Sequence, residues 1–290
     1  MVINLIFKCF YDIISSNQKG EVNMEKILLK DVDISKLKKL QQQGTKSSLY
    51  RDGHICYKFL DGLYEEEKEQ LYKKIFDMDG IKIENVLLPK QLIMKGDRLQ
   101  GYTMDYFADS MPLSDKFRVR YVDSKKLFDY VLKASQILKT IHSNEIICQD
   151  LSFENILVTE DGNVAFCDLD GCSYISHIAP FISVLMKRFL IDYRDEKIQI
   201  STNLDRISMM ISFYYLIYTK ELQNLTKKEY HKLSDKITTL KNTKTYANEL
   251  VDRTSTIGDI PYLVELIDSN DDYIYDRKKQ LSIVRRLFSR

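Results

Sequence analysis

Three polar side chains, Asp150, Asn155 and Asp168, stand at intervals that predict one shared site. They flank two short apolar runs, 156–159 and 164–167, and an Asp-Gly pair between such runs is the strongest short signal for a β-hairpin. Because a hairpin brings its outer ends together, we expect the three side chains to converge. Such oxygens hold Mg²⁺ against phosphates, and a carboxylate can orient and deprotonate an attacking hydroxyl. That chemistry is phosphoryl transfer from a nucleotide. The structural alternative is that all three are turn and cap residues.

A second set of elements could carry a phosphate-binding cation. Two alternating runs, 48–51 and 54–59, flank Asp52-Gly53 and predict an antiparallel hairpin. Because successive strand residues point to opposite faces, Lys58 lies on the face opposite the larger apolar side chains of its strand. The structural alternative is a lysine that extends its charged end to solvent.

A helix is expected next, over 64–76, where Glu67, Leu71 and Ile75 recur at four-residue spacing. A carboxylate therefore lies in line with the apolar stripe. The alternative is that Glu67 belongs to a solvated acidic run. The other acidic residues that could pair with Lys58 are Glu65, Glu66 and Glu69.

The remaining pattern divides the chain into two parts. Apolar runs between 86 and 107 predict another strand pair, so residues 24–106 are expected to form a small, mostly antiparallel sheet carrying one helix. Beyond this point apolar residues take helical spacing over 127–141 and 207–218, which predicts a larger, mainly helical part over 107–290. The chain is therefore expected to be an α+β protein.

Composition limits the classes of partner. The chain has 290 residues, of which 44% are hydrophobic and 29% charged, as in globular proteins. Its 43 basic and 42 acidic residues nearly cancel, so no global field attracts nucleic acid, and we expect no nucleic-acid partner. The 5 cysteines are an odd number without a CxxC pair, which favours a reducing cytoplasm.

The first 23 residues have an interpretation of their own. Charged residues interrupt the apolar runs within 1–15, which fall short of the ~20 residues that a membrane span needs, so we expect no stable membrane insertion. Residues 19–21, Lys-Gly-Glu, can be encoded by a purine-rich ribosome-binding sequence before Met24. We therefore expect a bacterial protein that starts at Met24, with 1–23 an untranslated or disordered leader.

The order of these pieces resembles the protein-kinase-like family. Asp150 and Asn155 keep the spacing of its catalytic loop, and Asp168 falls eighteen residues after Asp150, where the family has a metal-binding Asp. Upstream, 44–48 looks like a reduced glycine-rich loop and 55–58 like the strand of the phosphate-binding lysine.

The resemblance covers 44–218 and implies a bilobal protein-kinase-like fold. The N-lobe would be 24–106 and the C-lobe 107–290. The implied cofactors are ATP and Mg²⁺. Asp205 looks like the start of the long helix whose Asp braces the catalytic loop.

The resemblance also implies a role for each candidate residue. The implied catalytic residues are Asp150, Lys58 and Glu67. The implied nucleotide-binding residues are Gly44, Ser47, Ser48, Lys58, Met104 and Tyr106. The implied metal ligands are Asn155 and Asp168.

Several features depart from the family pattern. Gly44 alone survives of three loop glycines, which weakens the cradle of backbone amides for phosphate. Gln149 replaces an Arg, so a phosphorylated activation loop would have no partner there. Ser152 replaces a Lys beside the transferred phosphoryl group, and Leu169-Asp170 replaces Phe-Gly.

We expect an ATP- and Mg²⁺-dependent kinase that phosphorylates Ser or Thr of a protein substrate. The first alternative is a small-molecule kinase of the aminoglycoside- or choline-phosphotransferase type, since those relatives also lack the catalytic-loop Lys. The second is a pseudokinase that binds partners without turnover. All the polar groups that phosphoryl transfer requires are present, which favours catalysis.

Overall fold

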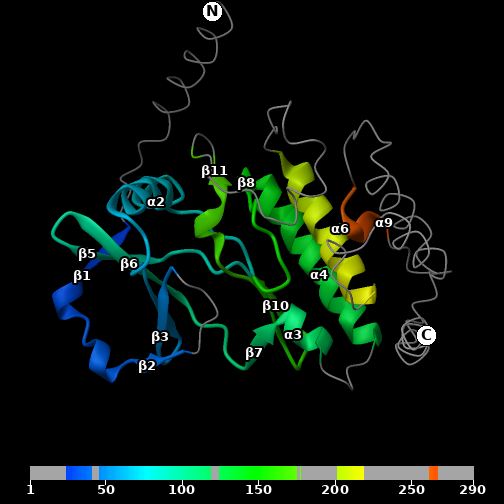
Figure 1. Ribbon diagram of the computed structural model, residues 1–290, viewed down its shortest axis with the longest axis horizontal. Coiled ribbons are helices and arrows are strands. Elements are labelled where there is room, and N and C mark those ends of the chain that lie inside the picture. The colour runs from blue at the N-terminus through cyan, green and yellow to red at the C-terminus, as the bar shows by residue number, and fades with distance from the viewer. Residues whose placement is uncertain are drawn as a thin grey trace, which may run out of the picture. The chain divides into compact units, whose positions relative to one another are not determined.

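The structure is a computed structural model of an α+β protein, and it describes residues 24–40, 46–118, 124–174, 177, 201–218 and 261–266 (Figure 1). The first compact unit comprises Met1–Ile81 and Pro89–Met104, and the second comprises Lys82–Leu88 and Asp105–Arg290. The proposed leader, 1–23, and Gly44 lie outside the described residues.

The first unit is built on a six-stranded sheet with the order β1-β5-β6-β4-β3-β2. Its strands are β1 (Glu25–Leu28), β2 (Lys38–Lys39), β3 (Ser48–Asp52), β4 (Ile55–Phe59), β5 (Gln91–Lys95) and β6 (Arg98–Asp105). Two short 3₁₀ helices, η1 (Leu29–Asp31) and η2 (Ile34–Lys36), join β1 to β2. The hairpins β3–β4 and β5–β6 are antiparallel, and Gly53 and Gly96 in their turns take φ of 54° and 59°. Both hairpins were predicted, because each turn needs a residue that tolerates positive φ.

The pairs β2–β3, β3–β4 and β5–β6 are antiparallel, as expected of a mostly antiparallel sheet, but the sheet is mixed because one pair is parallel. Strand β1 runs parallel to β5, with Glu25 opposite Gln91 and Leu28 opposite Met94. A two-residue turn forces neighbouring strands to run antiparallel, but strands separated by a long connection are under no such constraint. The direction of β1 therefore could not be inferred from local turn chemistry.

The strand predicted to begin at Val86 begins at Gln91 instead. Pro89 interrupts it, because proline has no N–H for a ladder and restricts the residue before it. Val86 forms a single bridge with Phe166, and Leu87 N donates to Phe166 O at 2.8 Å. The residues before Pro89 thus belong to the second unit.

Helix α2 (Glu65–Asp77) is the one predicted over 64–76. Leu71 and Ile75 are buried, which confirms the apolar stripe. At its first turn the Glu67 carboxylate accepts a hydrogen bond from Tyr64 N at 2.8 Å, which satisfies one of the backbone donors at the helix start.

The second unit contains helices α3 (Leu113–Arg118), α4 (Ser124–Ser143), α6 (Thr202–Tyr218) and α9 (Leu263–Leu266). A three-stranded sheet joins β10 (Val164–Phe166), β9 (Ile156–Thr159) and β7 (Ser110–Pro112) in that order. A two-stranded sheet pairs β8 (Ile146–Ile147) with β11 (Ser173–Tyr174), and η3 (Leu169–Gly171) precedes β11. Helices α4 and α6 lie side by side (Figure 1), with the Phe128 and Phe213 rings edge to face at 5.4 Å between centroids. Both helices confirm the predicted helical patterns.

The core of the second unit lies along one face of α4. Among the residues of this helix whose burial is described, the apolar ones that are completely buried are Val131, Ala134, Leu138 and Ile141. Their three- and four-residue spacing is the apolar pattern read from the sequence. Among the described residues, no helix is long and apolar enough to cross a membrane.

Replacing Leu138 with Ala tests this packing. The change removes buried methyl groups and leaves a cavity, so we expect the free energy of unfolding to fall by about 2–5 kcal/mol. Urea denaturation measures the effect. Gln136→Ala, at an exposed position of the same helix, is the control and is expected to change little. Equal effects of the two changes would contradict the assignment of the buried face.

Candidate functional site

The β9–β10 hairpin brings the three predicted polar residues of the second unit together. Ile156 pairs with Phe166, and beyond this pair Cys167 N donates to the carbonyl oxygen of Asn155 at 3.0 Å. Asp168 directly follows Cys167, so its backbone lies next to that of Asn155. The Asn155 side-chain nitrogen also donates to the carbonyl oxygen of Asp150 at 3.2 Å. These contacts bring the Asp150 loop, Asn155 and the backbone at Asp168 close together, and the convergence of all three side chains on one site stays a prediction.

Asp168 and Gln149, the residue before Asp150, have left-handed backbone conformations. Asp168 is left-handed, with φ 62° and ψ 42°, immediately before η3. Gln149, directly before Asp150, has φ 60°, and Asp150 N donates to Cys148 O at 2.7 Å across it. Left-handed residues other than glycine are uncommon, and such strain concentrates at functional sites.

The carboxylate of Asp150 lies at the surface, yet the surrounding protein removes part of its hydration. This desolvation raises the pKa of Asp150 above its ordinary value. A higher pKa makes Asp150 a better proton acceptor while it is ionised, as a catalytic base requires.

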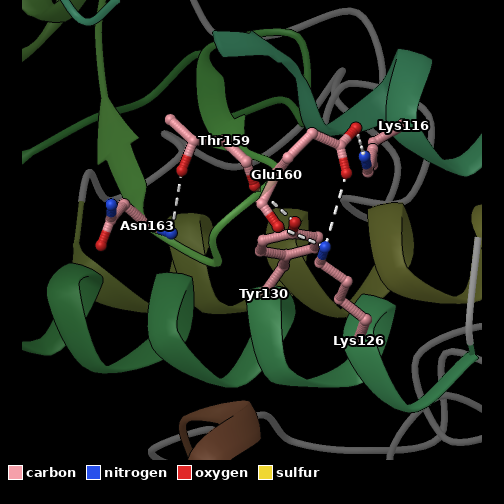
Figure 2. Close-up of polar contacts among 6 residues, drawn as sticks. All are labelled: Lys116, Lys126, Tyr130, Thr159, Glu160 and Asn163. Atoms are coloured by element: carbon pink, nitrogen blue, oxygen red, sulfur yellow. Dashed lines mark hydrogen bonds and ion pairs between the residues drawn. The ribbon is translucent and has the colours of Figure 1, made fainter. Parts of the chain in front are cut away.

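The tip of the same hairpin is fixed by side chains from α3 and α4 (Figure 2). Lys116, only 3% exposed, forms an ion pair with the Glu160 carboxylate, and Lys126 donates to the Glu160 backbone carbonyl. The Tyr130 hydroxyl donates to Thr159 O at 2.5 Å. These contacts hold the strands whose opposite ends carry Asn155 and Asp168. Sequence analysis did not find them, because a lysine on a helix gives no signal of a partner in a distant turn.

The Glu160 interactions predict a pH-dependent stability. Because the hydrogen bond from Lys116 lowers the pKa of Glu160, the stabilising contribution of this carboxylate is complete above its ordinary unfolded-state pKa and is lost as pH falls through the lower folded-state pKa. We expect Glu160→Gln to lower the urea midpoint at neutral pH, with a smaller difference from the unchanged protein in acid.

Glu84→Gln, at an exposed position of the same unit, is the control and is expected to leave the midpoint unchanged. A Glu160→Gln effect of the same size in acid and at neutral pH would contradict the ion-pair explanation.

A buried carboxylate in the first turn of α6 holds the two residues that precede Asp150 in the chain. Asp205, 0% exposed, accepts hydrogen bonds from Cys148 N at 2.6 Å and from Gln149 N at 2.8 Å. One side chain thus fixes two successive backbone amides, and the second of them belongs to the left-handed residue Gln149. The brace expected of Asp205 is present.

His142, at the end of α4, extends this network to α9. Its Nε2 lies 2.9 Å from the same Asp205 oxygen that Cys148 contacts, and its Nδ1 lies 2.8 Å from the Tyr262 hydroxyl. With Nε2–H donating to the carboxylate, Nδ1 accepts a hydrogen bond from the Tyr262 hydroxyl. The Arg206 guanidinium lies over the Tyr262 ring at 4.2 Å from its centroid. The helical pattern in the sequence ends at 141, one residue before His142, and it carries no signal of this role.

Replacing Asp205 with Asn tests the brace. An amide keeps one acceptor oxygen and turns the other position into a donor, which faces buried N–H groups. We expect the free energy of unfolding to fall by about 1–3 kcal/mol, measured by urea denaturation. Asp129→Asn, on the exposed face of α4, is the matched control. A change no larger than that of the control would rule out the brace as a stabilising interaction.

The remaining candidates belong to the first unit. Lys58, 5% exposed, lies on β4 with its nitrogen 5.8 Å from the centroid of the Tyr102 ring. Strand β6 approaches β4 so closely that a Cβ at Gly101 would collide with the Lys58 carbonyl. Glycine is therefore required at this position, and the close approach fixes the backbone from which Lys58 extends.

The carboxylate of Glu67 is held by Lys46, whose nitrogen is 3.2 Å from Glu67 Oε1. The neighbouring acidic residues have partners on their own helix: Glu65 pairs with Lys68 at 3.3 Å, and Glu69 with Lys73 at 2.7 Å. The pairing of Lys58 with Glu67 stays a prediction.

The other predicted nucleotide-binding residues also lie in or beside this sheet. Ser47 precedes β3, and Ser48 begins that strand opposite Phe59. Met104 is buried in β6, and Tyr106 follows the end of β6. Their role in binding a nucleotide stays a prediction.

Comparison with known proteins gives partial matches. No protein-family model matches the chain. It is 24% identical over 126 residues to serine/threonine-protein kinase PAK 4 of Homo sapiens and of Mus musculus, covering 43% of this chain and 21% of each relative. It is 26% identical over 122 residues to serine/threonine-protein kinase PAK 1 of Mus musculus, covering 42% of this chain and 22% of that protein.

The chain is distantly similar to serine/threonine protein kinases. The matches span about a fifth of the length of those relatives. The α+β architecture is compatible with a kinase-like fold.

Proposed function

We propose that the protein is an ATP- and Mg²⁺-dependent kinase with a bilobal protein-kinase-like fold, which transfers the γ-phosphoryl group of ATP to a Ser or Thr hydroxyl of a protein. The observation that carries this proposal is the linked geometry of Asp150, Asn155 and Asp168 around the β9–β10 hairpin. The distant similarity to serine/threonine protein kinases supports it.

The donor chemistry of this region fits Mg²⁺. Asn155 and Asp168 would supply one amide oxygen and one carboxylate. Mg²⁺ in nucleotide sites takes one or two protein ligands and completes its shell with phosphates and water. The described residues hold no group of three His, Cys, Asp or Glu side chains that could form a metal cage, and Mg²⁺ does not need one. When bound, the ion would neutralise charge on the phosphates.

The nucleotide and the acceptor would be handled by different residues. Lys58 would bind the nucleotide phosphates, because it is a buried cation on a central strand of the sheet. Asp150 would orient the acceptor hydroxyl and take its proton as the new oxygen–phosphorus bond forms and the bond to the ADP leaving group breaks. Asn155 would hold the loop of Asp150 beside the segment of Asp168. Its side chain contacts the Asp150 carbonyl, and its backbone carbonyl contacts Cys167 N.

The same proposal predicts how activity depends on pH. Asp150 accepts a proton only while ionised, and desolvation raises the pKa of this residue. Activity is therefore expected to fall as the pH drops through that raised pKa, and Asp150→Asn is expected to abolish turnover.

The proposed reaction is tested with γ-labelled ATP and Mg²⁺, comparing the full chain with Asp168→Asn and with the control Asp97→Asn in the exposed β5–β6 turn. We expect label on protein, lost in Asp168→Asn and retained in Asp97→Asn. Consumption of ATP without labelled protein would shift the assignment to a small-molecule acceptor. Ser152 is consistent with that alternative, because small-molecule kinases of this kind also lack the lysine of the catalytic loop. Mg²⁺-dependent ATP binding without turnover would establish a pseudokinase.

A further inference from the structure

Lys46 contacts helix α2 although it belongs to the segment before β3. Its backbone carbonyl accepts a hydrogen bond from Gly62 N at 3.0 Å, which places Lys46 beside the connection from β4 to α2. Its side-chain nitrogen reaches Glu67 Oε1 at 3.2 Å. This ion pair links the segment before β3 to the first turn of α2.

The Lys46–Glu67 ion pair is exposed to solvent, and Glu67 is also held by a second interaction, a hydrogen bond from Tyr64 N. The Lys46 side chain is 53% exposed and that of Glu67 30% exposed, and ion pairs of this kind contribute little to stability. The other oxygen of Glu67 accepts from Tyr64 N, which is the larger cause of its lowered pKa. Glu67 therefore stays ionised and in place when Lys46 leaves it.

The position of Lys46 relates it to the proposed phosphate site. Strand β3 pairs with β4 so that Leu49 lies opposite Lys58, and Lys46 precedes Leu49 by three residues. The sequence of 44–48 contains a single glycine, so it offers little of the backbone freedom with which glycine-rich loops bring amides close to a phosphate. A lysine supplies charge without that approach, because its ammonium group lies at the end of a long flexible stem.

We propose that Lys46 leaves the Glu67 carboxylate when the nucleotide binds and pairs with one of its phosphates instead. The inference rests on the proposed function, and it adds a phosphate-binding residue and a nucleotide-dependent contact. In the absence of nucleotide, Glu67 holds Lys46 near the start of α2. A triphosphate attracts this cation more strongly than one solvated carboxylate does, since it carries several negative charges.

Titration calorimetry with MgATP and, separately, with adenosine tests the exchange, because adenosine lacks phosphates. We expect Lys46→Gln to weaken MgATP binding about tenfold and to leave adenosine binding unchanged. Lys46→Arg keeps the charge and is expected to restore most of the MgATP affinity. Lys73→Gln, which removes a similar exposed lysine paired with Glu69 on α2, is the control and is expected to bind both ligands normally.

The outcomes separate this inference from the proposed function. An unchanged protein that binds neither ligand would overturn the kinase proposal itself. If the unchanged protein binds MgATP and Lys46→Gln binds it equally well, the phosphate role of Lys46 is wrong while the kinase proposal stands. A parallel loss of adenosine and MgATP affinity in Lys46→Gln would show that Lys46 acts on the shape of the site, which would also overturn the inference.

Discussion

The second unit depends on one buried charge, the carboxylate of Asp205. A carboxylate removed from water is costly unless its oxygens receive hydrogen bonds, and here the donors are two consecutive backbone amides and His142. The requirement to satisfy Asp205 therefore ties α6, the end of α4 and the loop before Asp150 to one another. Through His142 and the Tyr262 hydroxyl, α9 joins the same network.

Two lysine–glutamate pairs in the protein have different consequences because their exposure differs. Lys116 is buried against the β9–β10 hairpin, so removing its partner Glu160 leaves a cation in a poorly hydrated place. Lys46 is half exposed, so it can leave Glu67 for another anion without losing hydration. The first pair maintains the structure that presents Asn155, whereas the second is suited to exchange with a ligand.

Around Asp150, some residues match the protein-kinase pattern and others depart from it. The proposed metal ligands, Asn155 and Asp168, and the proposed acceptor carboxylate of Asp150 keep the spacing of the protein-kinase pattern. Ser152 and Gln149 replace cations of the protein-kinase pattern, so fewer positive charges surround the proposed phosphoryl group.

The sequence by itself determined the features that depend on neighbouring residues. Asp-Gly turns predicted two of the hairpins, and four-residue spacing predicted the buried stripe of α2. The intervals between Asp150, Asn155 and Asp168 predicted that their backbone segments lie close together. These features are local, because a turn or a helical turn spans only a few residues. Only the tertiary structure decided the parallel direction of β1, the partner of Glu67 and the contact between His142 and Tyr262. Those contacts join residues far apart in the chain, and their formation depends on how whole elements pack, which no local pattern of residues encodes.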